Sequence, residues 1–301
     1  MEKEKNYTPK QNKIKTAMPE KCFHAFNYIL MAAIGLLCLY PMWYVLMASF
    51  SDPNQMMMHS GGLLKPLGFS TSAYMKVFKN PNIISGYMNT IFILVSGVIL
   101  CLAMTSLGAY VLSRKNLLWK KPLMLFIMFT MFFSGGMIPF YLNLKSLHMT
   151  NSLWGLVIPF MINTYNMIIL RTAFESIPES LIEAAQIDGA SHIKILTGIV
   201  LPLSKASLAV MVLYYGVEKW NGWFWASCLI RDRALLPLQV ILREILLSST
   251  QSMQSGGGDT EAIGMTIRYA TIIVATVPIL CVYPFIQKYF TKGVMIGAVK
   301  E

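Results

Sequence analysis

Long apolar runs dominate this chain, and they restrict it to folds that can sit in a lipid bilayer. A membrane-spanning helix needs about 20 consecutive, mostly apolar residues. Only 13% of the 301 residues are charged, whereas a soluble domain carries about 25%. The sequence therefore predicts an all-α, polytopic membrane protein with six transmembrane helices. The six apolar segments are 23–50, 84–112, 122–144, 152–170, 203–225 and 269–290.

The lysines and arginines predict which helix ends face the cytoplasm, because these residues are enriched in cytoplasmic loops. With the N-terminus inside, sixteen of the 25 basic residues fall on the cytoplasmic side and eight fall outside, while Lys219 lies within the fifth span. The outer loop at 226–268 carries four arginines against this rule, but its length weakens the rule there. Both termini are therefore predicted to be cytoplasmic. The first apolar segment is predicted to be a retained helix, since no signal-peptide cleavage site follows it.

The predicted spans divide the chain into two tails, a first helix, an outer loop and a core. In the outer loop of the core, PLQVILREILL at 237–247 predicts an amphipathic helix, and SGGGD at 255–259 predicts a flexible tip. The divisions are 1–22 for the cytoplasmic N-terminal tail, 23–50 for the first transmembrane helix, 51–83 for an outer loop, 84–290 for the transmembrane core with its cytoplasmic loop at 171–202 and its outer loop at 226–268, and 291–301 for the cytoplasmic C-terminal tail.

The cytoplasmic loop at 171–202 interrupts the apolar sequence with a polar insert. Pro178 suits the first turn of a helix, where its missing N–H costs nothing, and Gly189 suits a helix end with left-handed backbone. Ser191 can then cap a second helix. The insert is predicted to form a helix, a sharp bend and a helix, and the small Ala184 and Ala185 would let a partner approach closely. Its carboxylates, which would meet basic groups on that partner, are Glu175, Glu179, Glu183 and Asp188.

Spacing separates this insert from an ordinary solvated loop, which composition alone would favour. The residues EAA at 183–185 are followed by Gly189 and then by I-x-L-P at 199–202. This pattern resembles the EAA loop in the membrane subunits of bacterial ABC importers. Most of residues 23–301 is similar to carbohydrate-importer permeases of the maltose-permease type, and above all to the lipoprotein-like or complex-polysaccharide permeases of Gram-positive bacteria. The matching stretches are FSGGMIP (133–139), RTAFESIPESLIEAAQIDGAS (171–191), EKWNGWFWA (218–226), LPLQVILREIL (236–246) and YPFIQKYFTKGVMIGAVKE (283–301).

The resemblance implies a type I ABC importer transmembrane fold and the role of a permease subunit. In that family the EAA helix is a coupling helix that docks on a separate ATPase subunit. ATP-driven closure of two ATPase subunits then switches the membrane helices from inward-facing to outward-facing, and the closing segment 291–301 is also expected to touch the ATPase pair. The ATPase-coupling residues implied here are Glu179, Glu183, Ala184, Ala185, Asp188 and Gly189.

The same resemblance implies the partners and the substrate. They are a second homologous permease subunit, two ATPase subunits, and an extracellular sugar-binding lipoprotein that delivers an oligosaccharide. The chain has no G-x-x-x-x-G-K-[ST] phosphate loop, so ATP and magnesium are expected on the ATPase subunits and no cofactor is expected on this chain. The expected location is the plasma membrane, in contact with the lipid bilayer.

The outer end of the fifth span carries the first candidates for the substrate path. Sugars bind against aromatic faces and a few polar groups in a mostly apolar cavity. Glu218 is ionisable within a span, and such residues usually face an interior; Trp220, Asn221 and Trp223 follow within one turn. A tryptophan belt at the membrane interface, with Lys219 extending toward the headgroups, explains the same residues. Both interpretations stay open at this point.

Two further features of the spans have alternative explanations. Asn163, Tyr165 and Asn166 in the fourth span form a second polar and aromatic patch, which hydrogen bonding between helices explains equally well. The pair Gly135-Gly136 in the third span suggests a local break of the kind tolerated beside a cavity. Close helix packing is the alternative.

Three other functions compete with oligosaccharide import. The chain could be an ABC permease for a non-sugar solute such as glycerol phosphate or a polyamine, a secondary transporter that works without an ATPase, or a membrane enzyme. No histidine has a carboxylate at a catalytic spacing, and the five scattered cysteines form no C-x-x-C pattern for zinc. The basic residues lie between apolar runs rather than on one polar face, so nucleic-acid binding is not expected.

Overall fold

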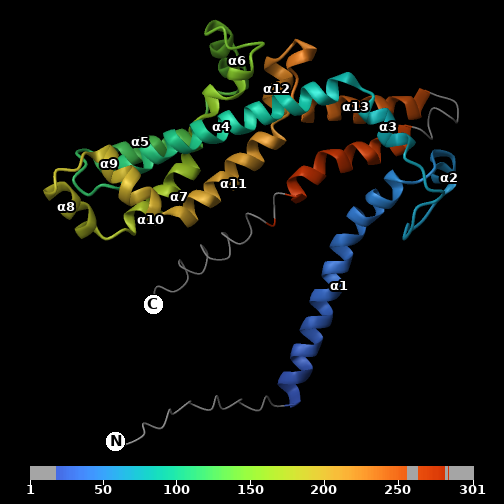
Figure 1. Cartoon of the computed structure of the whole chain (residues 1–301), viewed down its shortest axis with the longest axis horizontal. Coiled ribbons are helices and arrows are strands. Elements are labelled where there is room, and N and C mark those ends of the chain that lie inside the picture. The colour runs from blue at the N-terminus through green and yellow to red at the C-terminus, as the bar shows by residue number, and fades with distance from the viewer. Residues whose placement is uncertain (1–17, 256–263, 282–283, 285–301) are drawn as a thin grey trace, which may run out of the picture.

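The computed structural model describes residues 18–255, 264–281 and 284, and this part of the chain is almost entirely helical (Figure 1). Its one departure from helices and loops is an isolated antiparallel bridge between Ser51 and Phe69. The α-helices are α1 (Met18–Ser49), α2 (Pro53–Met58), α3 (Ser72–Phe78), α4 (Pro81–Ser113), α5 (Lys120–Phe132), α6 (Met137–Ser146), α7 (Thr164–Glu175), α8 (Glu179–Ile187), α9 (His192–Ile195), α10 (Leu201–Leu203), α11 (Lys205–Asn221), α12 (Phe224–Leu229) and α13 (Leu238–Ser255), followed by a helix at Gly264–Cys281.

Three helices of the described chain are long and apolar enough to cross a membrane unbroken. They are Glu20–Ser49 within α1, Pro81–Ser113, which is α4, and Gly264–Cys281. The other three apolar segments are bent pairs: α5 with α6, at 106°; the 3-10 turns of Leu153–Phe160 with α7, at 49°; and His192–Leu203 with α11, at 87°. The chain therefore offers six spans only when each bent pair counts as one.

The third predicted span, 122–144, is bent rather than straight, because it breaks between α5 and α6. Gly136 adopts φ +88 at the start of α6, a region of backbone that favours glycine. A Cβ built on Gly135 meets no atom within 4 Å, so close helix packing does not explain that glycine. Of the two alternatives raised by the sequence, the structure shows the break.

Helix α4 is the central element of the bundle and packs against α7, α11 and α13. A Cβ on Gly86 of α4 would lie 3.2 Å from the Leu238 Cα of α13, so this glycine permits the close approach of the two backbones. Thr90 Oγ1 accepts a hydrogen bond from the Leu238 N–H at 2.9 Å, which satisfies a donor in the first turn of α13.

The outer segments fold into helices rather than open loops. Residues 51–83 contain α2 and α3, and the Asp52 side chain caps α2 by accepting from Asn54 N and Gln55 N. The amphipathic helix predicted at 237–247 is confirmed as α13, and it runs on to Ser255. The predicted glycine tip beyond Ser255 and the tail at 291–301 lie outside the described residues.

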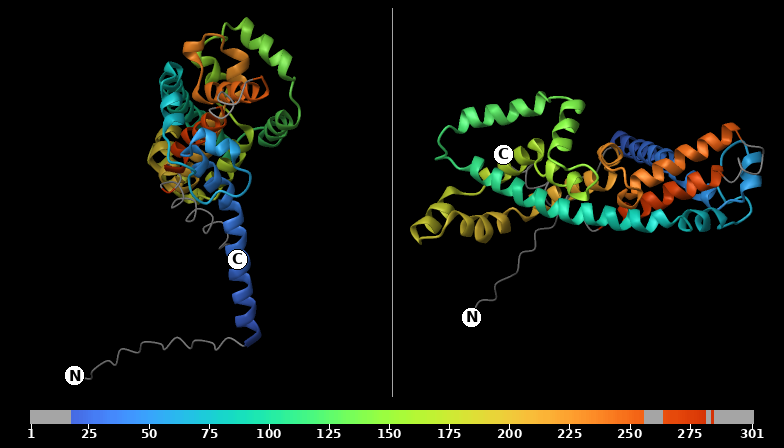
Figure 2. Two further views of the ribbon diagram at one scale, coloured as in Figure 1. Left: turned by 90° about the vertical axis from the view of Figure 1, so that its right-hand side faces the viewer. Right: turned by 90° about the horizontal axis from the view of Figure 1, so that it is seen from above.

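Within the described residues, helix α1 leaves the bundle and is attached to it near its C-terminal end (Figures 1 and 2). The most apolar stretch of this helix is 0% buried. Near its end, Ser49 Oγ lies 2.8 Å from the Tyr74 hydroxyl of α3, and Ala48 packs with Met56 and Leu63 in a small apolar cluster. Most of α1 therefore presents apolar side chains to whatever surrounds the chain.

Candidate functional site

The loop at 171–202 forms a helix, a bend and a second helix at one end of the molecule, as predicted (Figure 1). Pro178 directly precedes α8 at its N-cap position, one residue earlier than expected. Gly189 ends the helix with φ +77, and Ser191 Oγ accepts from the Lys194 N–H at 3.4 Å at the start of α9. Local backbone rules therefore set the shape of this α8–α9 unit.

One face of the α8–α9 unit is anchored in the bundle. Ile182 of α8 is 1% exposed and belongs to the same apolar cluster as Phe174 and Ile195, and Ala185 is half-buried against it. The Tyr110 hydroxyl of α4 lies 3.2 Å from His192 Nδ1 of α9. These contacts attach the unit to α4 and α7 and fix which side of α8 remains free.

The opposite face of the α8–α9 unit is exposed. It carries Glu183, Ala184, Asp188 and Gly189, together with Ile187, whose exposed fraction is 86%. This face therefore combines acidic groups with an exposed apolar side chain. Ala184 is therefore available to a partner, whereas its neighbour Ala185 packs inward.

The four carboxylates of the loop fall into two groups. Glu175 Oε1 accepts from Arg171 Nη2 at 2.7 Å and from Lys120 Nζ at 2.8 Å. Glu179 lies 3.8 Å from Lys115 Nζ. These two carboxylates connect the loop to the segment after α4, while Glu183 and Asp188 have no cation within 4.0 Å among the residues that the structure describes.

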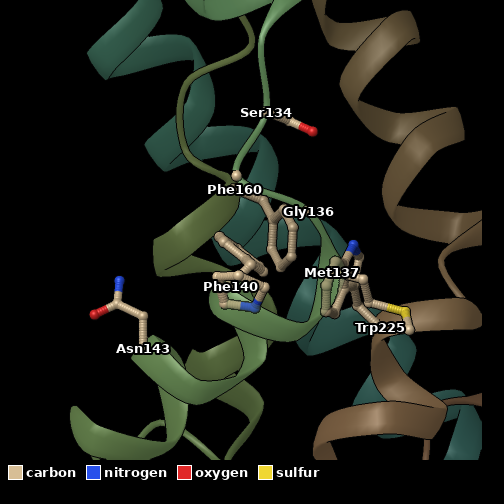
Figure 3. A pocket seen from close by; sticks show the side chains of 9 residues that line it. Ser134, Gly136, Met137, Phe140, Asn143, Phe160 and Trp225 are labelled. Atoms are coloured by element: carbon tan, nitrogen blue, oxygen red, sulfur yellow. The ribbon is translucent and has the colours of Figure 1, made fainter.

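A cavity of about 530 Å³ opens where the third span breaks (Figure 3). Gly136 and Asn143 contribute to its wall, and the rings of Phe140, Phe160 and Trp225 lie together on one side of it. The Phe140 and Trp225 ring centroids are 4.8 Å apart at an interplanar angle of 63°. The sequence pointed to the glycines of this site but gave no signal for its aromatic side chains.

A second cavity, of about 190 Å³, shares Phe160 and Trp225 with the first. It is lined by Glu218, Asn221 and Trp223, so three of the four residues predicted at the outer end of the fifth span come together there. These polar groups and aromatic rings are the kinds of side chain that bind sugars. The pair of cavities is the candidate substrate path.

Trp220, the fourth predicted residue, lies elsewhere. It is 8% exposed, belongs to the main apolar core, and donates its indole N–H to the Ala275 carbonyl at 3.3 Å. The residue that takes its expected place is Lys219, which lines the second cavity. The sequence signal for Lys219 was its position inside a span, but a lysine extending to the interface was an equally simple explanation.

The predicted patch in the fourth span does not join either cavity. Asn163 Oδ1 accepts from the Asn166 N–H at 3.2 Å and caps α7. Tyr165 is 55% exposed, and Asn166 is buried. Neither Asn163 nor Tyr165 lines the two cavities described above, so their part in a substrate path stays a prediction.

Comparisons with known proteins agree on one kind of molecule. A family model described as "binding-protein-dependent transport system inner membrane component" matches residues 66–296. The chain is 40% identical over 286 residues to the polygalacturonan/rhamnogalacturonan transport system permease protein YtcP of Bacillus subtilis (strain 168), covering 94% of this chain and 100% of that protein. It is 37% identical over 282 residues to Protein LplC of the same organism, covering 93% of this chain and 95% of that protein.

A solved structure is also similar over most of the chain. It is the crystal structure of a bacterial ABC transporter involved in the import of the acidic polysaccharide alginate. One of its chains matches with a TM-score of 0.82 and 33% sequence identity, covering 91% of this chain and 99% of that one. The match therefore extends over nearly the whole length of both chains.

Proposed function

The chain belongs to the family of binding-protein-dependent transport system inner membrane components, and we propose that it is one of two permease subunits of an ATP-driven oligosaccharide importer. In this role it forms half of the translocation pathway, with both termini in the cytoplasm. Glycerol phosphate, a polyamine or another non-sugar solute is the alternative cargo. An ATPase-independent secondary transporter is the weaker alternative, because it gives the exposed face of α8 no partner.

The exposed α8 face is the observation that carries the proposal. It presents Glu183 and Asp188, which have no cation within 4.0 Å among the described residues, beside the exposed Ile187 and the small Ala184. A soluble ATPase subunit with a basic and apolar cleft would fit this combination of charge and apolar surface. ATP and magnesium would then be bound by that subunit, which performs the hydrolysis.

The exposed apolar surface of α1 supports the presence of a second permease. A helix that is 0% buried over its most apolar stretch must be covered by lipid, by protein or by both. A second permease beside α1 would bury part of this surface and complete a pathway between the two chains. The remaining α1 side chains would face the bilayer.

The relatives support sugar as the cargo. YtcP is named for polygalacturonan and rhamnogalacturonan transport, and more distant relatives at 23% to 24% identity are named for arabinooligosaccharides and maltodextrin. The two cavities beside Phe160 and Trp225 offer the aromatic faces and polar groups that a sugar would need. An extracellular binding protein would deliver the oligosaccharide to this side.

An uptake assay tests the proposal. The chain would be co-expressed with the second permease, the ATPase and the binding protein, and the complex reconstituted into vesicles that enclose ATP. Uptake of a labelled oligosaccharide that requires both ATP and the binding protein supports the proposal. Uptake driven by an ion gradient without ATP would establish secondary transport instead, and uptake of glycerol phosphate or spermidine in place of sugars would replace the cargo.

A further inference from the structure

Lys219 is a buried cation inside a predicted membrane span. It lies in α11, is only 8% exposed, and lines the second cavity. A charged side chain within a membrane is costly, and those that occur usually face an interior or a water-filled cavity. The position of Lys219 therefore suggests a function that offsets the free-energy cost of burying a charge within the membrane.

The surrounding residues form a cradle for the lysine side chain. A Cβ on Gly97 of α4 would lie 3.2 to 3.3 Å from the Cγ, Cδ and Cε atoms of Lys219, so the glycine leaves room for the lysine stem. The amino group lies 5.4 Å from the centroid of the Phe160 ring. Because Phe160 belongs to the walls of both cavities, the cradle holds the cation at the boundary between them.

The amino group of Lys219 has few hydrogen-bonding partners within the described chain. Its hydrogen bond to the Phe160 carbonyl is long, at 3.5 Å, and that carbonyl already accepts from Cys101 Sγ at 3.4 Å. A lysine has three N–H donors. Among the described residues no carboxylate lies within 4.0 Å of it, so donors remain for a bound anion.

The charges around the cavity favour an anion over a cation. Glu218 contributes one carboxylate to the lining. Lys219 balances this charge within the lining, and Arg243 adds a second cation from outside the lining, with its Cζ 3.4 Å from the centroid of the cavity-lining Trp223 ring. The two cations outnumber the carboxylate, and Glu218 and Asn221 remain able to hydrogen-bond sugar hydroxyls.

We propose that Lys219 is a specificity-determining residue that binds a carboxylate of an acidic oligosaccharide, so that the permease itself prefers uronate sugars to neutral ones. This inference rests on the proposed function and names its substrate class. The aromatic rings of Phe160, Trp223 and Trp225 would pack against the sugar faces. The competing explanation is structural: Lys219 would only cap the Phe160 carbonyl where the fourth span breaks.

Calorimetric titration of the assembled importer, without its binding protein, tests the proposal with two matched probes. The probes are trigalacturonate and its methyl ester, which differ in the charge of the carboxyl groups. Wild type should bind the acid at least tenfold more tightly than the ester, because hydrogen bonds to a charged partner are the stronger kind. Raising the salt concentration should weaken binding of the acid alone.

Two variants separate recognition from a structural role. Lys219→Met should weaken acid binding about tenfold and change ester binding less than threefold. Glu218→Gln removes the opposing charge and keeps a hydrogen-bonding group, so it should raise the ratio of acid affinity to ester affinity about threefold. The Glu218 variant keeps the test decisive if the Lys219 variant fails to assemble.

Three results would overturn the inference: equal wild-type affinity for the two probes, equal losses for both in Lys219→Met, or no binding of either probe by the wild type. Failure of the proposed function looks different. In that case the vesicles show no ATP-dependent oligosaccharide uptake, whatever the two affinities are.

Discussion

At the scale of single residues, the carboxylates of the loop at 171–202 have two different roles. Glu175 is held by Arg171 and Lys120 within the chain, whereas Glu183 and Asp188 have no such cation among the described residues. The first kind joins α7 to the start of α5, and the second kind remains available to a partner. Composition alone could not make this division, because it depends on which cations fold against the loop.

Glu175→Gln should lower the stability of the complex in detergent by about 1 kcal/mol. The reason is that two partly buried cations lose a shared carboxylate, while the side chain is exposed enough for solvent to screen the pair. The measurement is a thermal unfolding scan of the purified complex. Glu244→Gln removes a more exposed pair, with Arg233 at 3.2 Å, and should change the midpoint less. Equal shifts for the two variants would contradict this account.

Residues that obey local backbone rules could be predicted, and residues whose direction depends on neighbouring helices could not. Gly189 and Ser191 occupy the bend and the cap that the sequence predicted, because both positions depend on the adjoining residues alone. Trp220 was predicted to lie on the substrate path but packs in the apolar core, and Lys219 lines the second cavity in its place. Their directions follow from the rotation of α11, which is set by Gly97 of α4 and by the Ala275 carbonyl.

At the scale of elements, hydropathy located the apolar segments but not their bends. The predicted fourth span, 152–170, contains the 3-10 turns of Leu153–Leu156 and Ile158–Phe160 before α7 begins. The third span breaks at Gly136, which the sequence raised as one of two alternatives. Bends depend on tertiary packing around a cavity, so an apolar run of sufficient length predicts a crossing but not a straight helix.

Gly136→Val should disrupt the break between α5 and α6. Gly136 has φ +88 and ψ 167, a conformation that costs a residue other than glycine about 1–3 kcal/mol. We expect lower thermal stability and reduced oligosaccharide uptake. The matched control is Gly135→Ala, since no atom lies within 4 Å of a Cβ there. Similar stability for Gly136→Val and wild type would show that the backbone at this break is not required.

At the scale of the whole molecule, α11 connects the α8–α9 unit, the proposed docking surface for an ATPase, to the cavities proposed as the substrate path. Its first residues follow α10 and the α8–α9 unit, and its last turn places Glu218, Lys219 and Asn221 on the second cavity. Its 17 residues span about 25 Å. A movement imposed on α8 therefore has a short route, through the bends at Gly189 and before α11, to the residues that would hold the sugar.

The central claim is that an ATPase subunit binds the exposed face of α8. Co-purification tests this claim most directly. The chain would carry an affinity tag and be co-expressed with the second permease and the ATPase. We compare wild type with Glu183→Lys, with Gly189→Pro, which cannot adopt the observed φ of +77, and with the control Glu244→Lys on α13. Wild type and the control should retain the ATPase, and the other two should lose it while still reaching the membrane with the second permease. Equal retention by all four would contradict the account.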